Sequence, residues 1–185
     1  MGRGFFKKCI ILLIVAGGIL GVSAFGALTS GEAASGSDLY SRAREAAQTG
    51  RRDAAYAYYN SILRLPQSKY HKTALFAKAE YFLISGDTYS AKSAWQLFLA
   101  QYPREIPETL FALVNSYHIA RKEKAEVEAA AIKQQIVQYQ QLSLIFRKSK
   151  DFCFMSPFFR RYQAVYSIDK IEFMIDGIPF ETILY

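Results

Sequence analysis

Hydrophobic and small residues recur in the middle of the chain with a period of 36 residues. Shifting the sequence by this distance brings apolar residues, glycines and alanines into register. The aligned pairs are Leu39/Leu75, Ala43/Ala79, Ala46/Phe82, Gly50/Gly86, Ala55/Ala91, Tyr59/Trp95, Ile62/Phe98 and Leu63/Leu99. The prolines that end the two units, Pro66 and Pro103, miss this register by one residue. A period in the thirties is typical of proteins built from stacked helical repeats.

Each repeated position has a physical role in a pair of antiparallel helices. The apolar positions before each glycine are three or four residues apart, so they lie on one face of a first helix. Gly50 and Gly86 suit the left-handed conformation that ends such a helix. Ala55 and Ala91 are small where the second helix would cross the first, and the large rings one turn later would fill the adjacent space. The pattern therefore predicts two helical hairpins.

A third unit follows, but its pattern is weaker. Pro107 suits the start of a helix, and Leu110, Leu113, Val114 and Tyr117 would share one face of that helix. No glycine follows, and residues 120–146 are rich in strong helix formers. We therefore expect one long helix here that closes the stack.

The order of these residues resembles the tetratricopeptide repeat, most clearly in GDTYSAKSAWQLFLAQYP at 86–103. The resemblance covers about residues 36–107 and is strongest to repeats of bacterial cell-envelope proteins. It implies a mainly α fold: a right-handed stack of antiparallel hairpins whose first helices line a concave groove. The groove positions would be Tyr40, Arg44, Gln48, Phe76, Glu80, Leu83 and Ile84. Alternatively, Phe76, Leu83 and Ile84 are buried under a neighbouring unit or under the C-terminal tail.

The tail, residues 151–185, is aromatic and favours strands. Asp176-Gly177 is a preferred two-residue turn, which predicts a β-hairpin that pairs Ile175 with Ile178 and Phe173 with Phe180. Residues 162–168 are a candidate third strand. In this register one face would carry Ile171, Phe173, Ile175, Ile178 and Phe180, and the opposite face Glu172 and Glu181. Because an isolated hairpin is marginally stable, its apolar face must pack on the helices or on another chain.

An uncharged apolar segment follows the cationic start MGRGFFKK. Residues 9–28 are long enough to cross a bilayer as a helix, and they also fit a secretory signal with small residues at 22–24. We therefore expect 1–28 to be a signal peptide or transmembrane anchor and 29–37 a flexible linker. A helical-repeat domain would follow at 38–150. Both interpretations place this domain beyond the inner membrane, in a bacterial periplasm.

Composition and charge exclude several classes of function. The net charge of +7 is scattered rather than clustered, so nucleic acid is not an expected partner. Two cysteines make no disulfide framework, and Cys153, between two phenylalanines, is expected to be a small buried residue. His71 and His118 stand outside any metal-ligand spacing, and no nucleophile or phosphate-loop motif is present. We expect neither enzymatic activity nor a cofactor.

These observations favour a non-enzymatic scaffold that binds a segment of an envelope or membrane protein in its groove. Mixed aromatic, apolar and charged groove positions suit a protein segment better than a phosphate backbone. The alternative is a structural subunit that forms a homo-oligomer through the hairpin or the aromatic segment 152–166. Binding of cell-wall glycan by exposed aromatic rings is a third hypothesis.

Overall fold

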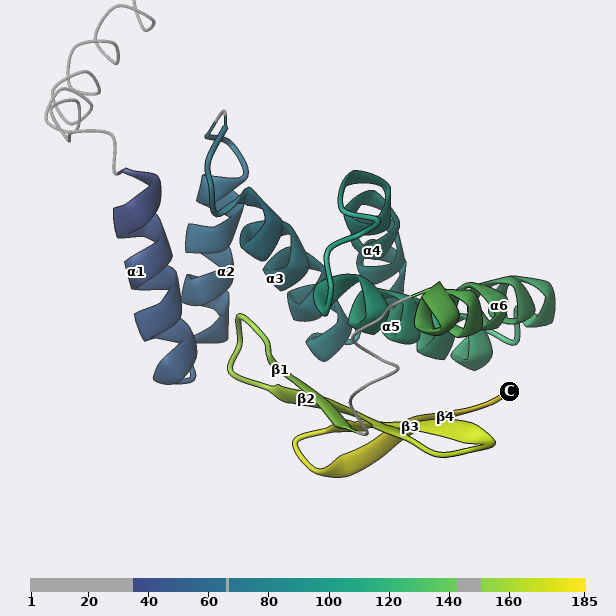
Figure 1. Ribbon diagram of the computed structural model, residues 1–185. Helices are drawn as coiled ribbons and strands as arrows, with labels where there is room; N and C mark the ends of the chain where they lie inside the picture. The colour runs from purple at the N-terminus through teal and green to yellow at the C-terminus, as the bar shows by residue number, and fades with distance from the viewer. Residues whose placement is uncertain (1–34, 66, 143–150) are drawn as a thin grey trace, which may run out of the picture. The chain divides into compact units, whose positions relative to one another are not determined.

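Helical hairpins precede an antiparallel sheet in the computed structural model (Figure 1). The structure describes residues 35–65, 67–142 and 151–185, which belong to one unit, Ser35–Tyr185. The helices are α1 (Gly36–Gln48), α2 (Arg52–Ile62), α3 (His71–Ile84), α4 (Thr88–Gln101), α5 (Glu108–Lys122) and α6 (Glu126–Leu142). The strands are β1 (Asp151–Met155), β2 (Arg161–Tyr166), β3 (Lys170–Ile175) and β4 (Ile178–Leu184). The fold is therefore mainly α with a small C-terminal sheet.

The expected signal peptide or anchor at 1–28 lies outside the described residues, as does most of the expected linker at 29–37. Helix α1 begins at Gly36, two residues before the expected start of the domain, and the Ser35 side chain accepts a hydrogen bond from the Asp38 N–H. This is an N-cap, which satisfies a backbone donor at the start of the helix. In the described part of the chain, no helix has the length and apolar character needed to span a membrane.

The first two hairpins turn at the predicted glycines. Gly50 and Gly86 have φ values of 74° and 80°. At each turn a backbone N–H reaches back to a carbonyl five residues earlier, from Arg51 to Ala46 and from Asp87 to Phe82. This bond defines the Schellman motif, in which a left-handed residue ends the helix.

The prediction of one long closing helix is wrong, because the chain turns between α5 and α6 as it does in the first two hairpins. Lys124 has a φ of 56°, and the Ala125 N–H bonds to the Ala120 carbonyl at 2.9 Å. A lysine thus adopts the left-handed conformation that glycine adopts in the first two hairpins. Helix propensity favoured a continuous helix at this point, and tertiary packing of α6 against α5 overrides it.

Small and large residues alternate inside the hairpins as the pattern predicts. The side chains of Ala55, Ala91, Tyr59 and Trp95 are all 0% exposed. Phe76 packs edge-on against Trp95, with ring centroids 4.8 Å apart. Burial of such large apolar side chains contributes about 2–3 kcal/mol each to folding, so these positions anchor the stack. Full burial of Trp95 also removes it as a stacking surface for a glycan.

The tail forms a four-stranded antiparallel sheet of order β1-β2-β3-β4. Ile175 pairs with Ile178 as predicted, and β2 is the third strand expected at 162–168. The expected pairing of Phe173 with Phe180 is wrong, because a bulge at Phe173/Met174 places Glu181 opposite Phe173. A bulge adds one residue to a strand and reverses its alternation beyond that point.

Burial along β4 departs from the prediction at two positions. Ile171, Phe173 and Ile175 of β3 are buried as expected, whereas Ile178, which precedes the bulge and pairs with Ile175 as predicted, is 69% exposed. Glu181, expected on the outer face, is nearly buried and binds His118 Nδ1 at 2.6 Å and Arg121 Nη1 at 3.1 Å. The expectation for Cys153 also fails: it is exposed, because side chains alternate along a strand and the phenylalanines on either side of it pack on the helices.

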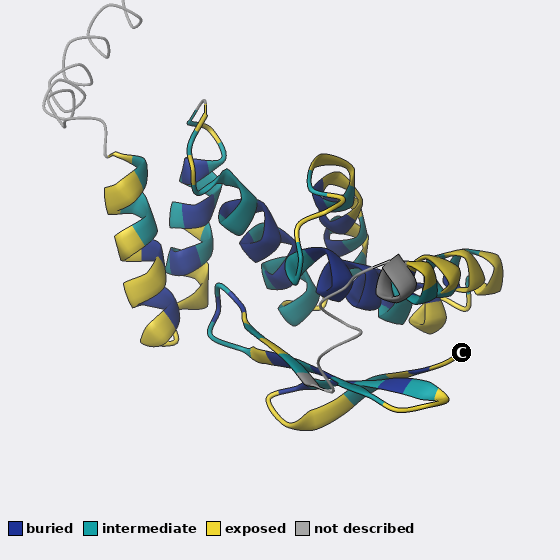
Figure 2. Ribbon diagram, in the orientation of Figure 1, coloured by how far each residue is buried: buried dark blue, intermediate teal, exposed yellow. Residues whose placement is uncertain are grey.

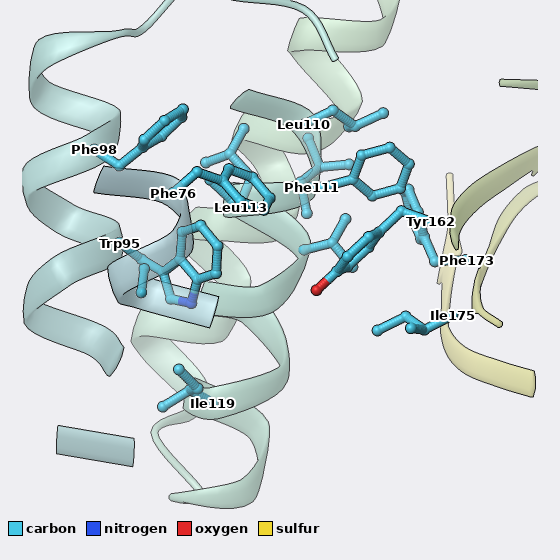
Figure 3. Close-up of a cluster of buried hydrophobic side chains, with 14 of the residues drawn as sticks. Phe76, Trp95, Phe98, Leu110, Phe111, Leu113, Ile119, Tyr162, Phe173 and Ile175 are labelled. Carbon is cyan, nitrogen blue, oxygen red and sulfur yellow. The ribbon is translucent and has the colours of Figure 1, made fainter. Parts of the chain in front are cut away.

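The sheet covers helix α5 and shares its core with the helices (Figures 2 and 3). Helix α5 is buried from Thr109 to Ser116 without interruption, as expected for a helix surrounded by protein. The Phe111 ring lies 5.1 Å from the Tyr162 ring and 6.3 Å from the Phe173 ring. The apolar face of the hairpin therefore packs on the helices of its own chain.

Candidate functional site

The seven predicted groove residues lie on α1 and α3, but the C-terminal sheet covers part of this surface. Phe76 is 1% exposed and Glu80 0% exposed. The rings of Phe154 and Tyr162, both from the sheet, pack against Phe76. In this arrangement Glu80 cannot contact a partner, and the ring of Phe76 is reachable only from the cavity described below.

The other five positions differ in accessibility. Gln48 and Arg44 are exposed, and Tyr40 is half-buried against the ring of Tyr70. Leu83 and Ile84 are partly buried against two separate clusters of core side chains. Of the seven predicted residues, Tyr40, Arg44 and the largely covered Phe76 line a cavity, described below.

Glu80 is a buried carboxyl group that joins α3 to the sheet. The Tyr162 hydroxyl donates a hydrogen bond to Glu80 Oε1 at 3.0 Å. Within the described residues the other oxygen, Oε2, makes no hydrogen bond of regular geometry. Burial raises the pKa of Glu80 to about 7, and the Ser156 and Tyr162 hydroxyls oppose part of that rise. Loss of solvation disfavours the charged form of a carboxyl group, so Glu80 titrates near neutral pH.

The turn between β1 and β2, residues 156–160, lies against the first two hairpins. Phe158 packs on the Tyr59 ring at 6.0 Å and on the Tyr81 ring at 6.4 Å. The Tyr59 hydroxyl donates to the Pro157 carbonyl at 3.2 Å. Burial is the main reason that the pKa of Tyr59 is well above its ordinary value, so this hydroxyl stays a donor at neutral pH. The sheet thus extends from α5 to α2 through its turn.

A cavity of about 300 Å³ remains between this turn and the helices. We call it the turn pocket. Its walls come from α1, α2, α3, α5 and the end of β1 with the following turn. The lining residues are Tyr40, Arg44, Tyr59, Thr73, Phe76, Glu108, Phe154, Met155, Ser156, Pro157 and Phe159. The pocket is mostly aromatic and apolar, as ligand pockets generally are.

Two charged side chains line the turn pocket, and their environments differ. The Glu108 carboxylate forms an ion pair with Lys72 Nζ at 2.9 Å. The Arg44 guanidinium lies over the Phe159 ring at 5.1 Å and the Tyr40 ring at 6.0 Å. No carboxylate of the described residues lies within ion-pair distance of Arg44. The pocket therefore presents a cation held by aromatic rings.

Sequence reasoning missed most of the turn pocket. The prediction placed every partner-binding residue on α1 and α3, whereas one side of the pocket comes from residues 154–159. The aromatic pair Phe158-Phe159 beside two arginines was visible in the sequence, but nothing local related it to Tyr40, more than a hundred residues away.

Another cavity of about 300 Å³ lies on α3 and α4, between Phe82 and Leu97. Among the described residues, no group of three or more histidine, cysteine, aspartate or glutamate side chains is placed to hold a metal ion. Comparisons with models of known protein families and with curated proteins find no match for this chain.

Proposed function

We propose that this protein is a non-enzymatic interaction scaffold that binds a segment of an envelope or membrane protein in the turn pocket. The observation that carries the proposal is the open, largely aromatic cavity in which the predicted groove residues Tyr40 and Arg44 meet the β1–β2 turn. Such a cavity can bury an apolar anchor side chain, and buried anchors supply most of the binding free energy at protein interfaces.

The repeat architecture supports the same proposal. Three consecutive hairpins with the same capping bond stack against their neighbours in the described part of the chain. Stacked hairpins form extended surfaces that are used for binding other proteins. The apolar segment at 9–28 supports an exported or membrane-tethered location for this scaffold, in line with the tetratricopeptide-like pattern of its sequence.

Site-specific photo-crosslinking in cells of the source organism tests the proposal. A photoreactive phenylalanine analogue replaces Tyr40 or Met155, which line the pocket, or Val127, which is 87% exposed on α6. We expect a discrete protein adduct from the two pocket positions and none from position 127. Absence of adducts at 40 and 155, or the same adducts at all three positions, would contradict binding in the pocket.

Self-association is a second candidate, favoured by one feature of the sheet. The strand order leaves β4 at an edge, and it exposes Ile178 and Leu184 at 69% and 56%. Open edge strands are ready templates for pairing with another chain. The aromatic segment 152–166 contributes less, because Phe158 and Tyr162 are buried within their own chain. A sedimentation run that shows only monomer at high protein concentration would refute this candidate.

A further inference from the structure

The charge of Arg44 is the first feature that limits what the turn pocket can bind. It is exposed and, within the described chain, has no carboxylate partner. Its guanidinium instead lies over two aromatic rings, which leaves the N–H donors at its edge available to an acceptor. Guanidinium groups bind carboxylates through paired hydrogen bonds.

The other charges near the pocket are held in ion pairs. Lys72 pairs with both Glu105 and Glu108, at 3.0 Å and 2.9 Å, so this group of three side chains keeps one net negative charge. Arg160 is paired with Asp176 at 3.3 Å. Of the two charged side chains that line the pocket, Arg44 is the one without an ion pair to the described residues, and an acidic ligand group would supply that partner.

The wall opposite α1 holds its shape at a conformational cost. Phe159 has a φ of 60°, a left-handed conformation that is unusual for a bulky residue. Its N–H bonds to the Ser156 carbonyl at 2.9 Å, which closes the turn and aims the ring at Arg44. Backbone strain of this kind occurs preferentially at functional sites and ligand clamps.

The size of the cavity limits the apolar part of the ligand. A volume of about 300 Å³ lies at the lower end of the range for ligand pockets, so it can accept one large side chain. The rings of Phe76 and Phe154 line this cavity in edge-to-face contact. An aromatic or large aliphatic anchor suits such rings.

We propose that the turn pocket binds an acidic peptide segment of a partner protein, with one large apolar side chain inside the cavity and a neighbouring aspartate or glutamate paired with Arg44. This inference rests on the proposed function and specifies its ligand. The recognition site is composite: the repeat helices supply the cation, and the β1–β2 turn supplies the ring that positions it.

Selection from a library of random nonapeptides tests the proposal. The target is the full chain in detergent micelles, and empty micelles remove peptides that bind detergent. Enriched peptides are resynthesised with a fluorescent label, and their dissociation constants are measured by anisotropy. The variants are Arg44→Glu and Arg44→Gln, and the matched control is Arg42→Glu, which changes an exposed arginine of the same helix outside the pocket.

We expect the enriched peptides to combine an aromatic or large aliphatic residue with an adjacent acid. Arg44→Glu should weaken binding at least tenfold and Arg44→Gln at least threefold, whereas Arg42→Glu should change it less than twofold. Replacing the peptide acid with lysine should restore binding to the Arg44→Glu protein.

Two results would overturn the inference, and they differ in what they imply for the proposed function. Enrichment of basic or uncharged peptides that compete at the pocket but ignore Arg44 would refute acidic recognition and leave peptide binding intact. If no enriched peptide binds more weakly to the Tyr40→Ala variant, both the acidic recognition and the proposed binding in the pocket are refuted.

Discussion

We expect the stability of the Glu80→Gln variant relative to wild type to be higher at pH 8 than at pH 4. Glu80 is 0% exposed, and burial raises its pKa to about 7 from an ordinary value of 4.5. Between these two pKa values the folded protein binds a proton that the unfolded chain releases. Stability contributed by this group is therefore complete below pH 4.5 and is lost as the pH rises through 7.

The magnitude follows from the two pKa values. Each pH unit between them changes the free energy of unfolding by about 1.4 kcal/mol, so the total loss in wild type is about 3 kcal/mol by pH 8. Glutamine carries no charge and accepts the Tyr162 hydrogen bond through its amide oxygen. The variant therefore avoids this loss, and any constant effect of the substitution is measured at pH 4.

Urea denaturation of a fragment that begins at Ser35 measures the difference. The quantity of interest is the free energy of unfolding of Glu80→Gln minus that of wild type, at pH 4 and at pH 8. It should rise by about 3 kcal/mol between the two, because other titrating groups cancel in the subtraction. Glu45→Gln, which alters a carboxylate whose side chain is 71% exposed, is the control. A Glu80→Gln difference that is the same at both pH values would refute a raised pKa at this site.

Three further predictions concern the hairpin turns, the helix crossings and the sheet. Lys124→Gly should raise the free energy of unfolding by about 1 kcal/mol, because glycine adopts a φ of 56° without strain, and Gly86→Ala should lower it by a similar amount. Ala91→Leu should cost about 1–3 kcal/mol, because it overpacks a fully buried crossing. Glu181→Gln should cost about 1–2 kcal/mol at pH 7 through weakened bonds to His118. Urea midpoints measure all of these effects.

Each of these predictions has an outcome that contradicts it. A neutral or destabilising Lys124→Gly would mean that the turn before α6 is not left-handed. Ala57→Leu, at an exposed position of α2, is the control for the crossing, and an equal effect at 57 and 91 would refute tight packing at the crossing. Although burial opposes it, His118 and Arg121 hold the pKa of Glu181 below its ordinary value. The Glu181 effect must therefore shrink as the pH falls below 4.5, and an unchanged effect at pH 3 would contradict the ion pair.

The sequence was sufficient where structure depends on neighbours within one hairpin. Glycine at 50 and 86 and alanine at 55 and 91 report a left-handed turn and a close helix crossing, both set by residues a few positions apart. The Asp176-Gly177 turn and the Ile175–Ile178 pair are local in the same sense. These features were predicted because backbone sterics and side-chain size act over short separations.

The same local rules failed where packing between distant segments outweighs them. Lys124 turns although its neighbours favour helix, and Cys153 is exposed although apolar residues flank it. The bulge that moves Glu181 toward His118 has no signature in the strand pattern. The turn at Lys124 depends on the packing of α6 against α5, and the other two outcomes depend on how the C-terminal sheet packs on the helices, which joins segments tens of residues apart.

The candidate site shows the same contrast between local and long-range effects. By itself the sequence determined that Tyr40 and Arg44 lie on a first helix of a repeated hairpin, since helical spacing places them there. Only the tertiary structure decided that Phe76 and Glu80 are covered and that Arg44 faces Phe159 across a cavity. The physical reason is that burial of an aromatic sheet on the helices is driven by total apolar area, which carries no direction along the chain.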